Sequence, residues 1–406
     1  MNLMKIAIIG SGFMGREIGK LLVEYAFPIL LKGRREDDVQ QFLDEARALL
    51  SKRRRWRKIS EEDYRSRLAR VEGTVHFDHR LSEADLVIES VAEDLEVKRE
   101  IFRTLEETCS EKAILCSNTS ALSISEISQA CRRRDRVVGL HFFHPLKFFK
   151  LMEVITGDGT SMETVQTACS LLKQIGKSFL VVKDSPAFFL SRNMLASLTE
   201  ALLALESGRY TIEEIDQMGR RSDALTGPFY SSDISGLDII YHSLLPLCER
   251  IPQRFQVPSI LLALLERGRL GKKNSKGFYS YQDGGLGVDA EMAAILESYR
   301  TKPQTNEPLQ FSMEHCMLRM MNESVYCVEE GIVGAQEVED VIRLVPAFSK
   351  GLFRHMDILG LDEVCRKLRG LEHRHGPRFA PAPMLVELVE KGWHGMKSGR
   401  GFFTYS

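Results

Sequence analysis

Residues 6–15 read IAIIGSGFMG, and this segment gives the clearest indication of the fold class. A short apolar run leads directly into a G-x-G-x-x-G loop, and residues 14–26 then carry apolar side chains at helical spacing. This order of strand, loop and helix is typical of dinucleotide-binding folds. Gly10 allows a tight turn, Gly12 lets the backbone approach a pyrophosphate, and Gly15 lets the helix pack closely on the strand. The loop therefore predicts cofactor contacts from Gly10, Gly12, Phe13, Met14 and Gly15.

Short apolar runs alternate with helical segments through the first 184 residues. We expect strands at 4–9, 28–32, 85–90, 113–118, 136–143, 151–157 and 179–183, and a polar helical region over roughly 36–70. Alternation of this kind predicts βαβ units and a largely parallel sheet. The interpretation is an α/β Rossmann-type domain over residues 1–184.

The remainder of the chain has a helical pattern and contains an internal repeat. Its matching pairs are SRNMLASLTEALLALESG (191–208) with LRMMNESVYCVEEG (318–331), DISGLDIIY (233–241) with DILGLDEVC (357–365), and KKNSKGFYSY (272–281) with MKSGRGFFTYS (396–406). We expect an all-α region of two tandem helical repeats, residues 185–290 and 310–406, joined by the polar stretch 282–309. Repeats of this size usually pack against each other.

Bulk properties exclude several classes of partner. The formal net charge of −1 over 406 residues offers no general attraction for nucleic acid or an anionic membrane. Eight cysteines without a CxxC pair indicate reduced thiols and no zinc site. The N-terminus shows no secretory pattern, and no run approaches the roughly 20 apolar residues of a membrane helix. We therefore expect a cytoplasmic protein that binds no metal, membrane or nucleic acid.

The end of the second predicted strand bears on the choice of cofactor. NAD-binding folds usually place an acidic residue there to bind the ribose, but this chain reads Gly33-Arg34-Arg35. A guanidinium pairs with a 2′-phosphate, which a carboxylate would repel. We predict NADP(H), bound partly through Arg34 and Arg35. The alternative is that both arginines are solvated and the cofactor is NAD.

Residues 139–157, GLHFFHPLKFFKLMEVITG, contain a candidate acid/base pair. His141 follows a predicted strand at the sheet edge where α/β folds place ligands, and Glu153 comes twelve residues later. A carboxylate commonly fixes the tautomer of a catalytic histidine. Such a pair can move a proton to or from an alcohol while a hydride is transferred. The alternative is a structural histidine.

These motifs together resemble the 3-hydroxyacyl-CoA dehydrogenase family. The similarity covers almost the whole chain. It rests on GSGFMG (10–15), DLVIESVAEDLEVK (85–98), SNTSALSISEI (117–127), HFFHP (141–145), LMEV (151–154), VVKDSPAF (181–188) and KKNSKGFY (272–279). The duplicated helical region resembles the longer members, which carry two C-terminal dehydrogenase domains.

The resemblance implies a role for each matching residue. His141 matches the catalytic histidine, Glu153 the acid that orients it, and Ser120 a serine that contacts substrate and nicotinamide. The matching positions on the cofactor side are Glu93, Lys98 and Lys273. The implied reaction is reversible hydride transfer between C3 of an L-3-hydroxyacyl thioester and a nicotinamide, in a cleft between the Rossmann domain and the first repeat.

Two positions depart from the family pattern. The asparagine of the usual HFFNP motif is His144 here, and a second asparagine in the first C-terminal helix is Ser191. His144 can donate a hydrogen bond or, if protonated, stabilise an oxyanion, and Ser191 can act through a water. We interpret the changes as an altered acyl substrate in an active enzyme.

Several alternatives stay open at this stage. One is a dehydrogenase of a carrier-protein-bound acyl group in a biosynthetic pathway, in place of an acyl-CoA enzyme of fatty acid metabolism. A second is a non-catalytic nucleotide-binding relative, and a third is an enzyme for a free hydroxy acid. The resemblance implies a further point, since members of the family with one helical domain usually dimerise through it. Here the second repeat can cover that surface, so we expect a monomer, with a homodimer as the alternative.

A basic run, KRRRWRK, occupies residues 52–58 on a predicted helix. The resemblance places this helical excursion near the nucleotide of CoA. The run can therefore meet CoA phosphates or an acidic carrier protein. The alternative is a solvated basic face.

Overall fold

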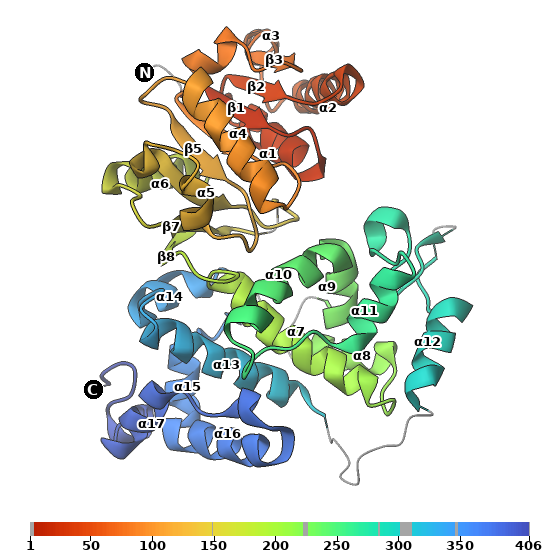
Figure 1. Cartoon of the computed structure of the whole chain (residues 1–406), viewed down its shortest axis with the longest axis vertical. Coiled ribbons are helices and arrows are strands. Elements are labelled where there is room, and N and C mark those ends of the chain that lie inside the picture. The colour runs from red at the N-terminus through yellow and green to blue at the C-terminus, as the bar shows by residue number, and fades with distance from the viewer. Residues whose placement is uncertain are drawn as a thin grey trace. The chain divides into compact units, whose positions relative to one another are not determined.

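The computed structural model describes residues 4–147, 149–221, 226–282, 285–300, 311–345 and 348–405. The chain divides into two compact units, Met1–Asp184 and Ser185–Ser406. Figure 1 colours the first unit from red to yellow and the second from green to blue. No described helix is both long and apolar enough to cross a lipid bilayer.

The first unit is built on one eight-stranded sheet with the order β3-β2-β1-β4-β5-β6-β7-β8. Its strands are β1 Ile6–Ile9, β2 Ile29–Lys32, β3 Val71–Thr74, β4 Leu86–Glu89, β5 Ile114–Ser117, β6 Val137–His141, β7 Leu151–Thr156 and β8 Ser178–Lys183. All neighbours are parallel except β6 and β7. The predicted Rossmann-type α/β fold is confirmed. The sequence prediction missed β3, whose residues VEGT form no apolar run.

Six α-helices in the described part of this unit connect these strands. They are α1 Phe13–Glu24, α2 Glu36–Arg55, α3 Glu61–Leu68, α4 Leu95–Thr108, α5 Ile124–Ser128 and α6 Met162–Gln174, with 3₁₀ turns at His79–Glu83 and Arg134–Arg136. Local chemistry explains where several of them begin. Asp94 accepts a hydrogen bond from the Val97 N–H at the start of α4, and Ser161 does the same for Thr164 at the start of α6.

The central strands are buried on both faces, as their uninterrupted apolar runs require. The position of β1 matters most for function. Its neighbours are β2 on one side and β4 on the other. Successive strands are therefore added outward in one direction from β1 to β3 and in the other direction from β4 onward, which makes this a topological switch point. Ligands of open α/β sheets bind beyond the carboxyl ends of the strands at such a switch point. The glycine loop follows β1 at this place.

In the described residues of the second unit, the regular structure is all helical. Its first part contains α7 Leu190–Glu206, α8 Ile212–Arg221, α9 Pro228–Ser235, α10 Leu237–Arg250, α11 Ser259–Glu266, a 3₁₀ turn at Lys272–Asn274 and α12 Ala290–Arg300. Its second part contains α13 Met313–Glu329, α14 Ala335–Ile342, α15 Phe353–Leu359, α16 Leu361–His375, α17 Pro383–Glu390 and 3₁₀ turns at Pro377–Phe379 and Met396–Ser398. Within the ranges that the structure describes, both parts contain five helices followed by a 3₁₀ turn in the same order, with α12 additional in the first part and the turn at Pro377–Phe379 additional in the second. Helix α7 packs against α13.

The joining stretch predicted over 282–309 needs a correction. It contains α12, whose Met292, Ile295 and Tyr299 are buried. The Tyr299 hydroxyl lies 2.9 Å from the Ser259 hydroxyl, so this helix belongs to the packed unit. Residues 301–310, which include the predicted start of the second domain, lie outside the described part of the chain.

Each repeat uses one buried aspartate to fasten its last segment. Asp233, in α9, accepts hydrogen bonds from the backbone N–H groups of residues 278–279. Asp357, in α15, does the same for residues 402–403. The equivalence of these contacts agrees with the repeat seen in the sequence.

Candidate active site

The loop after β1 has the geometry of a phosphate cradle. A Cβ on Gly10, which has φ +120°, would lie 2.3 Å from the carbonyl oxygen of Ser90, and a Cβ on Gly15 would lie 2.0 Å from that of Gly10. Both glycines are therefore required by close backbone approach. A Cβ on Gly12 would meet nothing within 4 Å, and α1 begins there with no acidic residue in its first turn. This open helix N-terminus fits a pyrophosphate.

The end of β2 carries arginines and leaves no room for an acidic side chain. A Cβ on Gly33 would lie 2.6 Å from Val39 Cγ2 and 3.0 Å from Ser11 Oγ. Arg35 is exposed, and its guanidinium pairs with both carboxylate oxygens of Asp38, at 2.7 and 3.1 Å. Within the described ranges, Arg34 makes no hydrogen bond or ion pair. Of the two predicted phosphate ligands, Arg34 is thus the one without a paired carboxylate.

A fully buried carboxylate organises the end of β4. Glu89 accepts hydrogen bonds from Lys98 Nζ at 2.7 Å, Ser117 Oγ at 2.6 Å and the backbone N–H of Val91 at 2.7 Å. Burial lowers the pKa of Lys98, but the carboxylates of Glu89 and Glu93 raise it overall. Lys98 therefore stays charged although its side chain is buried.

Three predicted site residues meet beside this carboxylate. The Glu93 carboxylate lies 3.3 Å from Lys98 Nζ and accepts the backbone N–H of Ser120 at 3.0 Å. It also accepts a hydrogen bond from the Thr119 hydroxyl. The loops after β4 and β5 are thereby tied together at the carboxyl edge of the sheet. This places Ser120 on the same edge as the glycine loop.

The candidate acid/base pair spans two neighbouring strands. His141 and Glu153 are opposite each other in the antiparallel pairing of β6 and β7. His141 Nδ1 lies 2.9 Å from Glu153 Oε2, and the two residues are 3% and 0% exposed. A buried carboxylate at this nitrogen favours a proton on Nδ1, which makes Nε2 the basic nitrogen. The predicted pairing of these residues is present in the structure.

His144 contacts the glycine loop. Its ring lies edge-on to that of Phe13, with 4.8 Å between ring centroids. Burial lowers the pKa of His144, and the Glu17 carboxylate opposes this only in part. A neutral imidazole is therefore the main form at neutral pH. This argues against an oxyanion contact from protonated His144 and leaves its capacity to donate one neutral hydrogen bond.

Ser191 and Lys273 belong to the second unit. Ser191 is half-buried in the first turn of α7. Lys273 Nζ lies 2.5 Å from both carboxylate oxygens of Asp238. The second repeat has the equivalent pair, Lys397 with Asp362 at 2.6 Å. Because the pair occurs in both repeats, it supports a structural role, and the cofactor role of Lys273 stays a prediction.

Sequence reasoning missed two residues that shape this edge. Glu89 was not singled out, although a charged residue that ends an apolar strand, DLVIE, is a usable signal. Asn118 was also missed. Its side-chain oxygen accepts the backbone N–H of Phe142 at 2.9 Å and so fixes the segment after His141.

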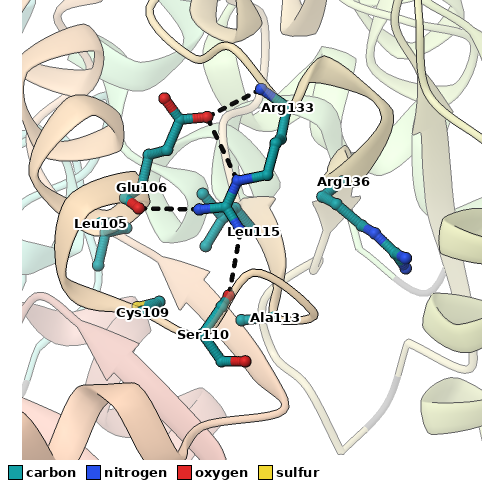
Figure 2. Close-up of a pocket in the computed structure, with 8 residues that line it drawn as sticks. All are labelled: Leu105, Glu106, Cys109, Ser110, Ala113, Leu115, Arg133 and Arg136. Carbon is teal, nitrogen blue, oxygen red and sulfur yellow. Dashed lines mark hydrogen bonds and ion pairs between the residues drawn. The ribbon is translucent and has the colours of Figure 1, made fainter.

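A small pocket lies away from these residues, at the end of α4 (Figure 2). Arg133 crosses it and donates hydrogen bonds to the carbonyl oxygens of Glu106 at 2.8 Å and Ser110 at 3.4 Å. These contacts satisfy carbonyl groups at the C-terminus of the helix. The pocket therefore has a structural explanation, and it contains no predicted site residue.

The basic run at 52–58 borders a second, open pocket of about 300 Å³. Its lining residues are Glu24, Leu49, Lys52, Arg53, Trp56, Lys58 and Lys147. Glu24 is paired with Arg53 at 2.6 Å, and the ammonium groups of Lys52 and Lys58 lie 4.6 and 5.5 Å from the centroid of the Trp56 ring. Four cations and an indole face around one paired carboxylate form a site suited to anions.

Comparison with known proteins agrees with this geometry. Residues 5–185 match the NAD-binding domain of 3-hydroxyacyl-CoA dehydrogenase, and residues 188–281 and 311–405 each match the C-terminal domain of that family. Fatty acid oxidation complex subunit alpha from Idiomarina loihiensis is 31% identical over 397 residues, and the protein of the same name from Shewanella amazonensis is 32% identical. Each alignment covers 96% of this chain and 55% of the relative.

Solved structures give the same picture. A 3-hydroxybutyryl-CoA dehydrogenase from Escherichia coli K12 has a TM-score of 0.81 at 25% identity, covering 97% of this chain and all of that chain. An (S)-3-hydroxybutyryl-CoA dehydrogenase from Ralstonia eutropha has a TM-score of 0.64 at 29% identity, covering 70% of this chain and all of its own. The chain spans about half the length of the curated relatives it matches. It is a member of the 3-hydroxyacyl-CoA dehydrogenase family.

Proposed function

We propose that this chain is a 3-hydroxyacyl thioester dehydrogenase, or 3-ketoacyl thioester reductase in the reverse direction. The observation that carries the proposal is the buried His141–Glu153 pair at 2.9 Å, on the edge of the sheet that also bears the glycine loop. The names of the similar solved structures, 3-hydroxybutyryl-CoA dehydrogenases, favour an acyl-CoA substrate.

The residues of the first unit divide the chemistry between them. When bound, a nicotinamide supplies the hydride acceptor or donor. His141 takes the proton of the C3 hydroxyl in oxidation and returns a proton to the C3 oxygen in reduction. Glu153 keeps the imidazole oriented and stabilises its protonated form. Ser120 and His144 are proposed to hydrogen-bond the substrate oxygen or the nicotinamide amide, and Ser191 to position the substrate.

Cofactor binding is proposed to use both loops at the sheet edge. The N-terminus of α1 with Gly10, Gly12, Phe13, Met14 and Gly15 is proposed to hold the pyrophosphate, and Glu93 and Lys98, which pair at 3.3 Å, are proposed to lie near the cofactor. NADP(H) is the proposed preference, because Gly33 excludes an acidic residue and Arg34 has no paired carboxylate among the described residues. NAD is the alternative, favoured by the Asp38 carboxylate that pairs with Arg35.

The basic pocket is the proposed handle for the thioester carrier. Its cations and the Trp56 face suit the phosphates and adenine of CoA. An acidic carrier protein is the second candidate, since the rest of the run, Arg54, Arg55 and Arg57, extends the positive surface beyond the pocket.

We also propose that the two helical repeats are two tandem domains that cover each other, which allows a monomer. The support is the packing of α7 on α13. Ion pairs between the two repeats add to it. Glu200 of the first repeat pairs with Arg378 of the second at 2.8 Å, and Glu323 of the second pairs with Arg254 of the first at 3.3 Å. A tight dimer in sedimentation at low concentration would contradict the monomer.

The proposal is tested with four parallel assays of reduced-nicotinamide absorbance. Acetoacetyl-CoA and free acetoacetate are each offered with NADPH and with NADH. We expect the reduced nicotinamide to be oxidised with acetoacetyl-CoA and not with free acetoacetate. With acetoacetyl-CoA, we expect NADPH to be oxidised faster than NADH. Equal rates with the free acid would favour a hydroxy-acid dehydrogenase. Faster oxidation of NADH would remove the 2′-phosphate assignment and leave the reaction class standing.

A further inference from the structure

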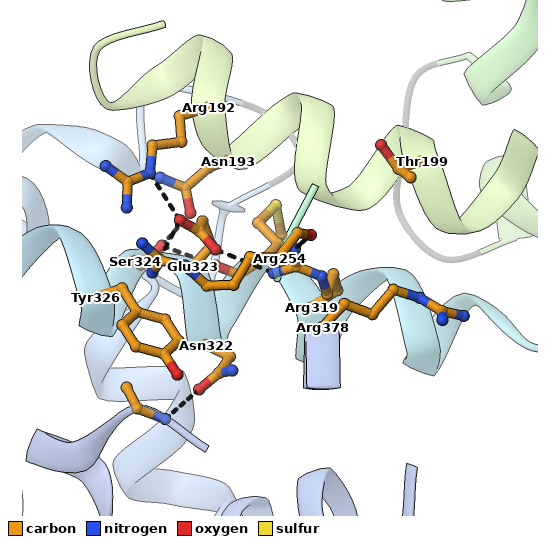
Figure 3. A network of polar contacts seen from close by, with 12 residues as sticks. Arg192, Asn193, Thr199, Arg254, Arg319, Asn322, Glu323, Ser324, Tyr326 and Arg378 are labelled. Carbon is orange, nitrogen blue, oxygen red and sulfur yellow. Dashed lines mark hydrogen bonds and ion pairs between the residues drawn. The ribbon is translucent and has the colours of Figure 1, made fainter. Parts of the chain in front are cut away.

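The start of α7 is held by charged groups of the second repeat. Arg192 is 0% exposed, and its Nε lies 2.6 Å from Glu323 Oε1. Its two terminal nitrogens lie 2.8 and 2.9 Å from the two carboxylate oxygens of Glu330. Figure 3 shows Arg192 and Glu323 between the helices of the two repeats. Arg192 directly follows Ser191, the predicted substrate-positioning residue.

A second contact holds the next residue of the same turn. The Ser324 hydroxyl donates to Asn193 Oδ1 at 2.6 Å, and Asn193 Nδ2 donates to the backbone oxygen of Phe189 at 2.7 Å. Asn193 and Ser324 are both buried. The second repeat therefore binds the side chains of two consecutive residues, 192 and 193. Asn193 in turn donates a hydrogen bond to the residue at the N-cap of the helix.

The chain that enters α7 needs such support. Ala187 and Phe188 both have φ +55°, and both are fully buried. Non-glycine residues adopt this left-handed conformation rarely, and it persists only where the surrounding structure holds it. The Arg192 backbone N–H donates to the carbonyl oxygen of Ala187 at 3.1 Å, so the gripped turn is bonded directly to the strained one.

The repeat provides an internal reference for this arrangement. Glu200 and Glu323 occupy equivalent positions, each eight residues before the glycine that ends the aligned stretch. Both are buried and both pair with an arginine of the other repeat. The position equivalent to Arg192 is His315 in the second repeat, so only the first repeat has an arginine at its helix start. The grip is thus a feature of α7, not of helix packing in general.

We propose that Glu323, Ser324 and Glu330 of the second repeat are positioning residues for Ser191. They fix the first turn of α7 through Arg192 and Asn193, so the second repeat sets the geometry of the substrate site without touching the substrate. This inference rests on the proposed function, because Ser191 matters only if the first turn of α7 faces the substrate. Positioning within a fraction of an ångström is what such a turn requires, since small displacements of a reacting group cost large factors in rate.

Glu330 and Ser324 give the sharpest variants. The Glu330 side chain is 36% exposed, so Glu330→Gln removes the carboxylate charge that faces Arg192 without burying a new polar group. The same change also weakens the pair of Glu330 with Arg254, at 2.6 Å. Ser324→Ala removes the hydrogen bond to Asn193 by an independent route. Glu200→Gln is the control, because it breaks a different ion pair between the repeats, that of Glu200 with Arg378, and leaves Arg192 untouched. None of these residues is assigned a chemical role.

Two measurements separate positioning from general loss of stability. The first is kcat and KM for acetoacetyl-CoA, with Ser191→Ala combined with Glu330→Gln in a double-mutant cycle. The second is amide hydrogen exchange of residues 186–194, followed by mass spectrometry, which needs no activity. We expect Glu330→Gln and Ser324→Ala to lower kcat roughly ten- to a hundredfold and to change KM for the nicotinamide little. In the Ser191→Ala background the Glu330→Gln effect is expected to shrink.

The control distinguishes the outcomes. Faster exchange of residues 186–194 in the two grip variants, with Glu200→Gln at the wild-type rate, supports the inference. Equal behaviour of Glu330→Gln and Glu200→Gln in exchange and in kcat overturns it. Additive effects of Glu330→Gln and Ser191→Ala would also overturn it, since Glu330 would then act by another route. Absence of turnover in the wild type would reject the proposed function, and the exchange experiment would still decide whether the turn is held.

Discussion

Replacing Glu153 with glutamine removes one charge from a buried pair and leaves its shape nearly unchanged. His141 Nδ1 lies 2.9 Å from Glu153 Oε2, and the carboxylate is 0% exposed. When His141 carries the proton, the pair consists of opposite charges whose centres lie about 4 Å apart. At an effective dielectric constant of about 20 this attraction is about 4 kcal/mol. At about 1.4 kcal/mol per tenfold change in rate, kcat should fall roughly a thousandfold.

The assay follows reduced nicotinamide at saturating acetoacetyl-CoA, and circular dichroism checks that the variant is folded. Glu106→Gln is the control, because Glu106 is also a mostly buried carboxylate of the first unit and accepts the backbone N–H groups of Arg132 and Arg133. It should lower stability and leave kcat unchanged. A folded Glu153→Gln enzyme with the wild-type kcat would refute the assignment of Glu153 as the residue that orients His141 during proton transfer.

Three further predictions concern cofactor, carrier and pH. Arg34→Ala should lower kcat/KM for NADPH roughly tenfold to a hundredfold relative to NADH, as loss of a charge-assisted hydrogen bond implies; an unchanged ratio would count against a 2′-phosphate contact. Lys58→Ala should raise KM for acetoacetyl-CoA but not for acetoacetyl-N-acetylcysteamine, which lacks the nucleotide, and equal shifts would place the CoA phosphates elsewhere. Burial raises the pKa of Asp233 from its ordinary 3.8 to about 6. The folded state therefore holds a proton that the unfolded state releases, and this group's contribution to stability falls by about 3 kcal/mol as pH rises through that window. In urea unfolding, the free energy of unfolding of Asp233→Asn should lose this part of its pH dependence. Parallel plots of the free energy of unfolding against pH for the variant and the wild type would argue against this role of Asp233.

The strands that the sequence predicted best are those buried on both faces. Their apolar runs end at a glycine or a polar residue, which marks their limits well. The edge strand β3 has the sequence VEGT, in which only Val71 is a bulky apolar residue, so periodicity could not reveal it. Similarly, α12 was taken as part of a linker because polar residues on its exposed face dilute the buried Met292, Ile295 and Tyr299.

Contacts between site residues were predictable where the residues lie on neighbouring strands and are also close in the sequence. His141 and Glu153 are twelve residues apart and become opposite neighbours through one antiparallel connection. Contacts between the repeats were out of reach in detail. Arg192 and Glu330 are separated by 138 residues, and neither local sequence indicates that the two side chains pair. The internal repeat did contain a signal for these contacts. An Arg-Phe pair recurs at Arg254 and Arg378, and each of these arginines pairs with a glutamate of the other repeat.

Electrostatics also changed one expectation. The sequence left open whether His144 is charged at neutral pH. Its half-buried position beside the Phe13 ring lowers its pKa, which could not be inferred from the HFFHP motif alone. Likewise, the two arginines after Gly33 looked equivalent in sequence, and the Asp38 contact separates them.

The most direct test of the account is to compare the wild type with His141→Asn in turnover of acetoacetyl-CoA, with reduced-nicotinamide binding measured in parallel by fluorescence. We predict that the wild type oxidises the cofactor, whereas the variant binds it equally well and shows almost no turnover. Wild-type turnover that persists in the folded variant, or a folded wild type that binds the cofactor and never oxidises it, would contradict the assignment of His141 as the proton-transferring residue of a 3-ketoacyl thioester reductase.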